Sequence, residues 1–185
     1  QVKSLKGFSA KEIAGLIPYS YESTTLGITC LEDVGLCEKI QDGPRRKILR
    51  FPCKGMELWK KAGQVLISPL EKRFYCEGIR TDKEYPACGI NALAHYTWLN
   101  PDPERMLMLT SKEYRSLKSA EAFDSPNVFD GKIIVEVWKY PVIKMAEENK
   151  EWVDRLSLAL SLGNDDDPRI EKEVERMIND IQWKD

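Results

Sequence analysis

Three groups of residues in this sequence have types and a spacing that could carry chemistry. Arg45-Arg46-Lys47 is a run of three cations, and such cations hold the phosphate groups of nucleic acids. Cys88 lies seven residues before His95, the only histidine, and these are the residue types of a thiol nucleophile and its base. Asp165-Asp166-Asp167 is a run of carboxylates, which hard metal ions prefer as ligands.

The second and third groups are better explained by structure. The sequence identifies no residue that would orient His95, so we interpret it as a histidine packed on a helix. Asp167 before Pro168 is a typical helix start, where carboxylates cap free amide groups and compensate the helix dipole. The sequence contains no Gly-rich phosphate loop, nucleophile elbow or paired Cys/His zinc spacing. We therefore predict no enzyme activity, no catalytic residue, no cofactor and no metal site.

Two helices are predicted before the cationic run. Ser9-Ala10-Lys11-Glu12 has the form of a capping box, and the apolar spacing behind it predicts a short helix over residues 9–17. Ser20 can cap a second helix, over residues 20–34, and Gly35 is a suitable stop for it.

A β-hairpin is predicted next. Residues 36–40 and 45–51 alternate apolar and polar side chains on either side of an Asp-Gly turn signal at residues 41–44. The cationic run therefore lies at the tip of the hairpin. The alternative interpretation of this run is an ordinary solvated loop.

This order of elements resembles a winged helix–turn–helix, as in MarR-like and related bacterial transcription regulators, over about residues 4–52. Residues 9–17 resemble the supporting helix and residues 20–34 the recognition helix. Leu31-Glu32-Asp33-Val34-Gly35-Leu36 resembles the L-E-x-x-G-[LI] passage into the wing, and residues 40–47 resemble the wing turn.

The resemblance implies a regulator that binds double-stranded DNA as a homodimer, with the recognition helix in the major groove and the wing on phosphates. A first helix normally precedes the other two, so either it lies upstream of Gln1 or residues 1–6 form its last turn. The DNA-binding residues implied are Ser20, Tyr21, Thr25, Thr29, Arg45, Arg46 and Lys47.

The predicted recognition helix also supports an alternative function. It contains no Lys or Arg, and Glu22 and Leu26 lie on its outward face together with Tyr21, Thr25 and Thr29. Most helices that read the major groove carry a basic residue. The alternative is a protein-binding module, such as an antitoxin whose C-terminal domain neutralises a toxin partner.

The order of two helices and a hairpin ends at Pro52, and a different pattern of helices and strands follows. We therefore predict a winged-helix domain over residues 1–54 and a small α+β domain over 55–185. The segments around Trp98, Trp138 and Trp152 are interpreted as core, or otherwise as a partner surface. The predicted helices cover residues 56–67, 91–98, 110–122, 153–162 and 167–181, and the predicted strands 72–77, 105–109 and 133–138.

The second domain carries a resemblance of its own. Gly89-Ile90-Asn91-Ala92-Leu93-Ala94-His95-Tyr96 resembles a small-residue helix in the antitoxins of abortive-infection pairs, which repress their own promoter and restrain a nucleotidyltransferase-like toxin. It implies a domain that senses a protein partner or an effector, and it assigns no catalytic position.

Composition indicates a globular α+β protein of 185 residues, with 42% hydrophobic and 31% charged residues. The net charge is −2, with +3 over residues 1–54 and −5 over residues 151–185, so an anionic partner is expected at the N-terminal third. Five cysteines without a C-x-x-C pair or a secretion signal predict reduced thiols and a cytoplasmic protein, and those in helix- and strand-like segments, such as Cys30, are expected in the core. The apolar runs are too short for a membrane span.

Overall fold

The chain divides into two compact units. The computed structural model describes residues 7–142, 151–163 and 165–183. Of these described residues, the first unit comprises 7–66 and 182–183, and the second comprises those between 67 and 181. The first unit thus extends past residue 54, the predicted end of the first domain. The predicted last turn of an earlier helix, at residues 1–6, lies outside the described residues.

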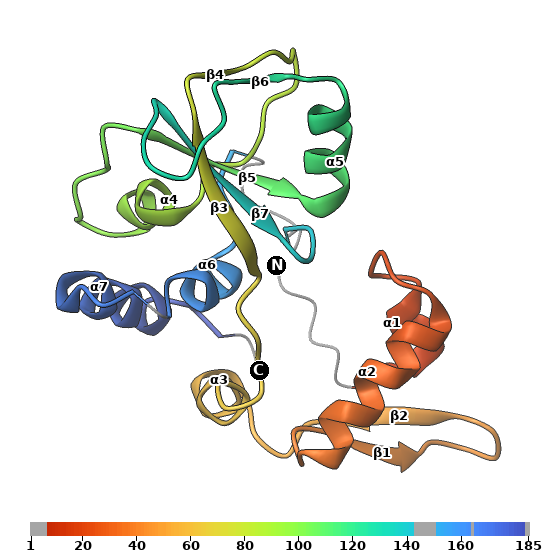
Figure 1. Ribbon diagram of the computed structural model, residues 1–185. Coiled ribbons are helices and arrows are strands. Elements are labelled where there is room, and N and C mark those ends of the chain that lie inside the picture. Colours follow the sequence, from red (N-terminus) through yellow and green to blue (C-terminus); the bar gives the residue numbers. More distant parts are fainter. Residues whose placement is uncertain (1–6, 143–150, 164, 184–185) are drawn as a thin grey trace. The chain divides into compact units, whose positions relative to one another are not determined.

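The first unit contains the predicted order of two helices and a hairpin, followed by a third helix (Figure 1). Both predicted N-caps are confirmed, because Ser9 forms a capping box with Glu12 and Ser20 accepts a hydrogen bond from the Ser23 amide. The elements are α1 (Ala10–Ala14), α2 (Tyr21–Asp33), β1 (Glu38–Gln41), β2 (Lys47–Arg50) and α3 (Gly55–Ala62).

The passage from α2 into the hairpin explains the spacing of Leu31, Gly35 and Leu36. Gly35 has φ +73°, a left-handed conformation that glycine adopts at little cost. The Leu36 amide then donates to the Leu31 carbonyl over 2.8 Å, which closes the end of the helix. The chain therefore turns back beneath α2, and the core of this unit forms from Ile13, Ile28, Cys37 and Leu49, with Phe8, Ala10, Leu31 and Phe51 packed against it.

A tail from the other end of the chain completes this unit. Trp183 packs on the start of α3, where a Cβ on Gly55 would lie 3.0 Å from the Trp183 Cβ. Gly55 also has φ +51°, so a larger residue would be strained as well as crowded.

The second unit is built on a mixed three-stranded sheet in the order β3-β7-β5. The central strand β7 is antiparallel to β3 and parallel to β5, and all six of its residues are buried. The α+β class is confirmed. Its elements are β3 (Leu70–Cys76), β4 (Gly78–Ile79), α4 (Gly89–Tyr96), β5 (Arg105–Thr110), α5 (Ser111–Ser119), β6 (Phe123–Asp124), β7 (Ile133–Trp138), α6 (Arg155–Leu162) and α7 (Pro168–Asn179).

Helices cover both faces of this sheet (Figure 1). One face packs against Tyr114 and Leu117 of α5, and α4 lies on the other face and contacts α6 and α7. The small β4–β6 pair was not predicted. The core on the α5 side consists of Phe74, Cys76, Leu107, Leu109, Ile133, Val135 and Val137.

A buried carboxylate lies on the opposite face, in the middle of β7. Glu136 is fully buried, and its cross-strand neighbours are Arg73 on β3 and Met108 on β5. Arg73 Nη2 donates to Glu136 Oε1 over 2.7 Å, and Trp138 Nε1 donates to Oε2 over 3.0 Å. A buried charge is costly unless it is paired. This network therefore stabilises the pairing of β3 with β7 on the face of the sheet that α4 covers.

Two sequence interpretations about cysteine and tryptophan are corrected in part. All five cysteines are free, as predicted, but Cys30 is exposed because it lies on the outward side of α2. Trp138 is fully buried, whereas Trp98 is 85% exposed at the end of α4. Among the helices of the described ranges, none has the length and apolarity required to cross a membrane.

Removal of the cationic partner of Glu136 tests the network. We expect R73M to lower the free energy of unfolding by about 3 kcal/mol, because the carboxylate stays buried without its ion pair. Urea denaturation followed by tryptophan fluorescence measures this. R115M is the matched control, because among the described residues the Arg115 guanidinium bonds only to the main chain of its own helix. It should change stability by less than about 0.5 kcal/mol. Equal effects of the two variants would contradict the assignment.

Candidate nucleic-acid interface

The hairpin places its cations on two different faces. Its register pairs Lys39 with Leu49 and Gln41 with Lys47. Paired residues and alternate residues share a face of a two-stranded sheet, so Lys39 and Lys47 lie on the same face as Leu49. Leu49 is buried in the core with Ile28 of α2, so this is the face that turns toward α2.

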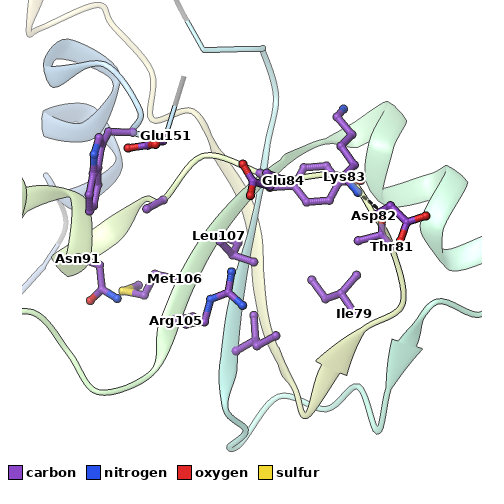
Figure 2. A pocket seen from close by; sticks show the side chains of 14 residues that line it. Ile79, Thr81, Asp82, Lys83, Glu84, Asn91, Arg105, Met106, Leu107 and Glu151 are labelled. Carbon is purple, nitrogen blue, oxygen red and sulfur yellow. Dashed lines mark hydrogen bonds between the residues drawn. The ribbon is translucent and has the colours of Figure 1, made fainter. Parts of the chain in front are cut away.

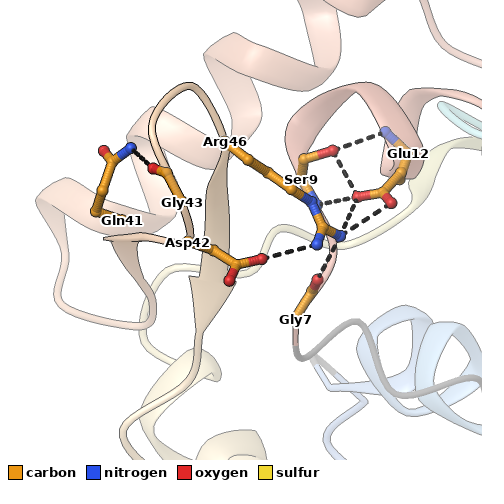
Figure 3. A network of polar contacts seen from close by, with 7 residues as sticks. All are labelled: Gly7, Ser9, Glu12, Gln41, Asp42, Gly43 and Arg46. Carbon is orange, nitrogen blue, oxygen red and sulfur yellow. Dashed lines mark hydrogen bonds and ion pairs between the residues drawn. The ribbon is translucent and has the colours of Figure 1, made fainter.

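The guanidinium group of Arg46 forms contacts that fix the hairpin tip (Figure 3). Its Nη1 pairs with Asp42 Oδ2 over 2.7 Å, and its Nη2 pairs with Glu12 Oε1 over 3.0 Å and donates to the Gly7 carbonyl over 3.3 Å. Glu12 in turn accepts from the Ser9 amide over 2.7 Å and from the Ser9 hydroxyl over 2.6 Å. Arg46 therefore ties the turn of the hairpin to the first turn of α1.

Arg45 and Lys47 are the cations of the tip that remain available. Both are exposed, and neither side chain forms a hydrogen bond or an ion pair with any residue that the structure describes. Lys47 lies near the end of α2, since the pKa of Glu32 is lowered chiefly by hydrogen bonds from Lys39 and to a lesser degree by the charge of Lys47.

The exposed face of α2 carries Tyr21, Glu22 and Leu26. Tyr21 is 53% exposed and Leu26 is 66% exposed, and the opposite side of the helix buries Thr24 and Ile28. No cation lies on this helix, so its outward face is apolar and acidic.

Thr25 and Thr29 differ from the prediction that they face outward. Both are half-buried, and the Thr25 hydroxyl is buried without a hydrogen-bond partner among the described residues. The Thr29 hydroxyl donates to the Thr25 carbonyl over 3.1 Å and accepts from Lys39 Nζ over 3.3 Å. The reason is the helical period, which puts these residues on the flank of α2 that faces β1.

Ser20 and Lys39 complete the surface. Ser20 is exposed, and its hydroxyl is used as the N-cap of α2. Lys39 was not singled out from the sequence, and it forms an ion pair with Glu32 over 2.8 Å. The alternation of the strand would have placed Lys39 with Lys47, but only once the register of the hairpin was known.

The remaining chemistry-bearing residues lie in the second unit and do not form a site together. His95 is exposed rather than packed, and its ring stacks on Trp152 at 4.4 Å between centroids. Cys88 precedes the same helix and is fully buried, and this burial raises the pKa of its thiol well above the usual value. Seven residues of helix separate the two by about 10 Å along the axis.

The acidic run has the structural role that was predicted for it. Asp167 caps α7 by accepting from the Arg169 amide over 2.9 Å, and its carboxylate also pairs with the Arg169 guanidinium. Among the residues that the structure describes, no group of three His, Cys, Asp or Glu side chains could hold a metal ion.

The available geometry thus consists of a hairpin tip with two unpaired cations beside an exposed helix face. Comparisons with protein-family models, curated proteins and solved structures find no match to this chain.

The Arg46 network predicts an unusual titration of Glu12. Hydrogen bonds from the Ser9 hydroxyl and amide, followed by Arg46, lower the pKa of Glu12 from 4.5 to about 2. Since the folded-state pKa is depressed, the contacts stabilise the fold above pH 4.5 and are lost as the pH falls through about 2.

NMR titration of the Glu12 side-chain carbonyl checks this. We expect S9A and R46Q to raise the pKa toward 4.5, with the larger change for S9A, because its hydroxyl makes the largest contribution. R45Q is the matched control and leaves the titration unchanged. A wild-type midpoint near 4.5 would contradict the network.

Proposed function

We propose that the first unit is a winged helix–turn–helix that binds double-stranded DNA, and that the chain is a cytoplasmic transcription regulator. The observation that carries this proposal is the pair of unpartnered cations, Arg45 and Lys47, at the tip of a hairpin whose inner face turns toward the exposed helix α2. Residues 38–50 have a net charge of +3, so the hairpin is the basic part of the unit.

The hairpin suits contacts with phosphates. Arg45 and Lys47 can each neutralise one phosphate and release its counterions, which gives affinity without sequence information. Arg46 acts as a positioning residue, because its bonds to Glu12 and Asp42 hold the tip before DNA arrives. A preformed tip lowers the entropy lost on binding.

Helix α2 suits contacts with base edges that do not need a cation. The Glu22 carboxylate can accept from the amino group of cytosine, and Leu26 can contact the methyl group of thymine. Tyr21 is exposed at the start of the same helix, with Ser20 beside it as the cap. The acidic character of this face predicts modest affinity for one copy, so we propose a homodimer that binds two half-sites.

The salt dependence of binding tests the role of the hairpin tip. We expect R45A/K47A to weaken binding to the DNA upstream of the protein's own gene. It should also reduce the slope of log affinity against log salt by about 2, since each phosphate contact contributes about 1. Fluorescence anisotropy at several salt concentrations measures both quantities.

A matched variant controls for the loss of charge. R50A/K60A removes two cations as well, but Arg50 lies on the other face of the hairpin and Lys60 lies on α3. It should leave the slope nearly unchanged. If the two double variants behave alike, the cations of the tip do not contact DNA.

Sequence preference tests the role of α2. We expect E22Q/L26A to reduce the preference for the best site over a single-base variant by about tenfold, because each good base contact discriminates by about 1–3 kcal/mol. T29V should leave that preference unchanged, since Thr29 faces Lys39 rather than the groove. Competition binding with a panel of single-base variants measures the preference. A loss of preference in T29V, with none in E22Q/L26A, would show that Thr29 reads the bases and that Glu22 and Leu26 do not.

The outward face of α2 favours a second candidate, a protein-binding module. Its exposed Leu26 and its lack of cations fit a protein surface as well as a groove. This candidate requires a complex with the purified product of the adjacent gene that L26D disrupts and R45A/K47A preserves, together with no mobility shift on DNA at low salt.

A further inference from the structure

The second unit contains an open cavity of about 790 Å³ that the proposed DNA interface does not use (Figure 2). We name it the β5 trench. Its sides are the segment of residues 81–87, the first half of β5, and residues 151–152. Its size lies within the range of ligand-binding pockets, about 300–1,000 Å³.

The floor of the trench is apolar. Leu107 and Ile133 belong to the core on the α5 side of the sheet, and Ile79 packs against that core. Tyr85 and Trp152 add aromatic surface and are half-buried. A ligand lying here would therefore bury apolar groups against a rigid sheet.

Charged side chains of both signs surround this floor, and three of them lack partners among the described residues. Arg105, Asp82 and Glu84 form no side-chain hydrogen bond or ion pair with a described residue. Figure 2 shows Arg105 on β5 and Glu84 on the segment opposite it. By contrast, Lys83 is paired with Glu113.

The main chain along one side is also unpaired. In the described part of the chain, the amide and carbonyl groups of Asp82, Glu84 and Tyr85 form no hydrogen bond, and the segment is irregular, with a bend at Asp82. The same segment becomes paired immediately afterwards, where the Pro86 carbonyl accepts from Met108 and Ala87 pairs with Leu107. Residues 82–85 therefore offer free main-chain donors and acceptors next to a segment that is paired with β5.

We propose that the β5 trench binds an extended peptide segment of a partner protein. Main-chain groups of the segment pair with residues 82–85, an acidic side chain reaches Arg105, a basic side chain reaches Glu84 or Asp82, and an apolar side chain lies on the floor. The unpartnered side chains of the trench are Asp82 and Glu84 against Arg105, a balance that suits a segment of mixed charge better than a polyanion. This inference concerns the second unit and is independent of DNA binding by the first.

The experiment uses the full chain and a pool of fluorescein-labelled nonapeptides that alternate Val or Leu with polar residues and carry one Glu and one Lys. We expect anisotropy to report binding below about 1 mM. R105A should weaken it about three- to fivefold, the effect of an exposed ion pair of up to about 1 kcal/mol. A pool with Gln in place of Glu should bind the wild type and R105A equally. E84Q should show the same behaviour toward a pool with Gln in place of Lys.

A control and a second readout separate this site from adventitious apolar binding. R115A removes an exposed arginine of α5 outside the trench and should leave binding of the pool unchanged. Hydrogen exchange of the amides of Asp82, Glu84 and Tyr85 should slow when the peptides are added, because these amides gain partners. Absence of binding below about 1 mM, equal effects of R105A and R115A, or unchanged exchange of the three amides would each overturn the proposal.

Discussion

The second unit depends on one buried charge, the carboxylate of Glu136 in the central strand β7. Its two oxygens are held by different neighbours, Arg73 on the adjacent strand and Trp138 two residues along its own strand. A residue of this type is tolerated in a core only when its partners are in place, so pairing of β3 with β7 and neutralisation of the charge form together. The start of α4 packs closely against this carboxylate. Gly89 has φ +56°, and a Cβ there would lie 3.7 Å from Glu136 Oε1 and 2.7 Å from Met106 Sδ.

The first unit shows how a small domain divides its cations between structure and binding. Arg46, Arg50 and Lys39 each pair with a carboxylate within the unit. Arg45 and Lys47 do not pair with the residues described around them. A cation that already forms an ion pair within the unit is a weaker candidate for a phosphate contact. Binding to the phosphate must first break the existing pair, and the free energy of that pair is lost. The proposed interface is therefore narrower than the run of three cations.

The two proposals assign one unit to a polyanion and the other to a chain of mixed charge. The difference follows from the local balance of charges, which is basic along the hairpin and mixed around the β5 trench. Each surface rests on contacts within its own unit, so each can be tested by itself.

The sequence by itself determined the features that depend on near neighbours. The caps Ser9, Ser20 and Asp167 and the strand Ile133–Trp138 could be predicted, because they rest on contacts two or three residues apart or on a run of β-branched and aromatic residues. Only the tertiary structure decided that Arg46 bonds Glu12, 34 residues away, that Arg73 bonds Glu136, 63 residues away, and that Thr29 turns toward Lys39. Such contacts depend on register and on how helices pack on strands, and no local pattern encodes either.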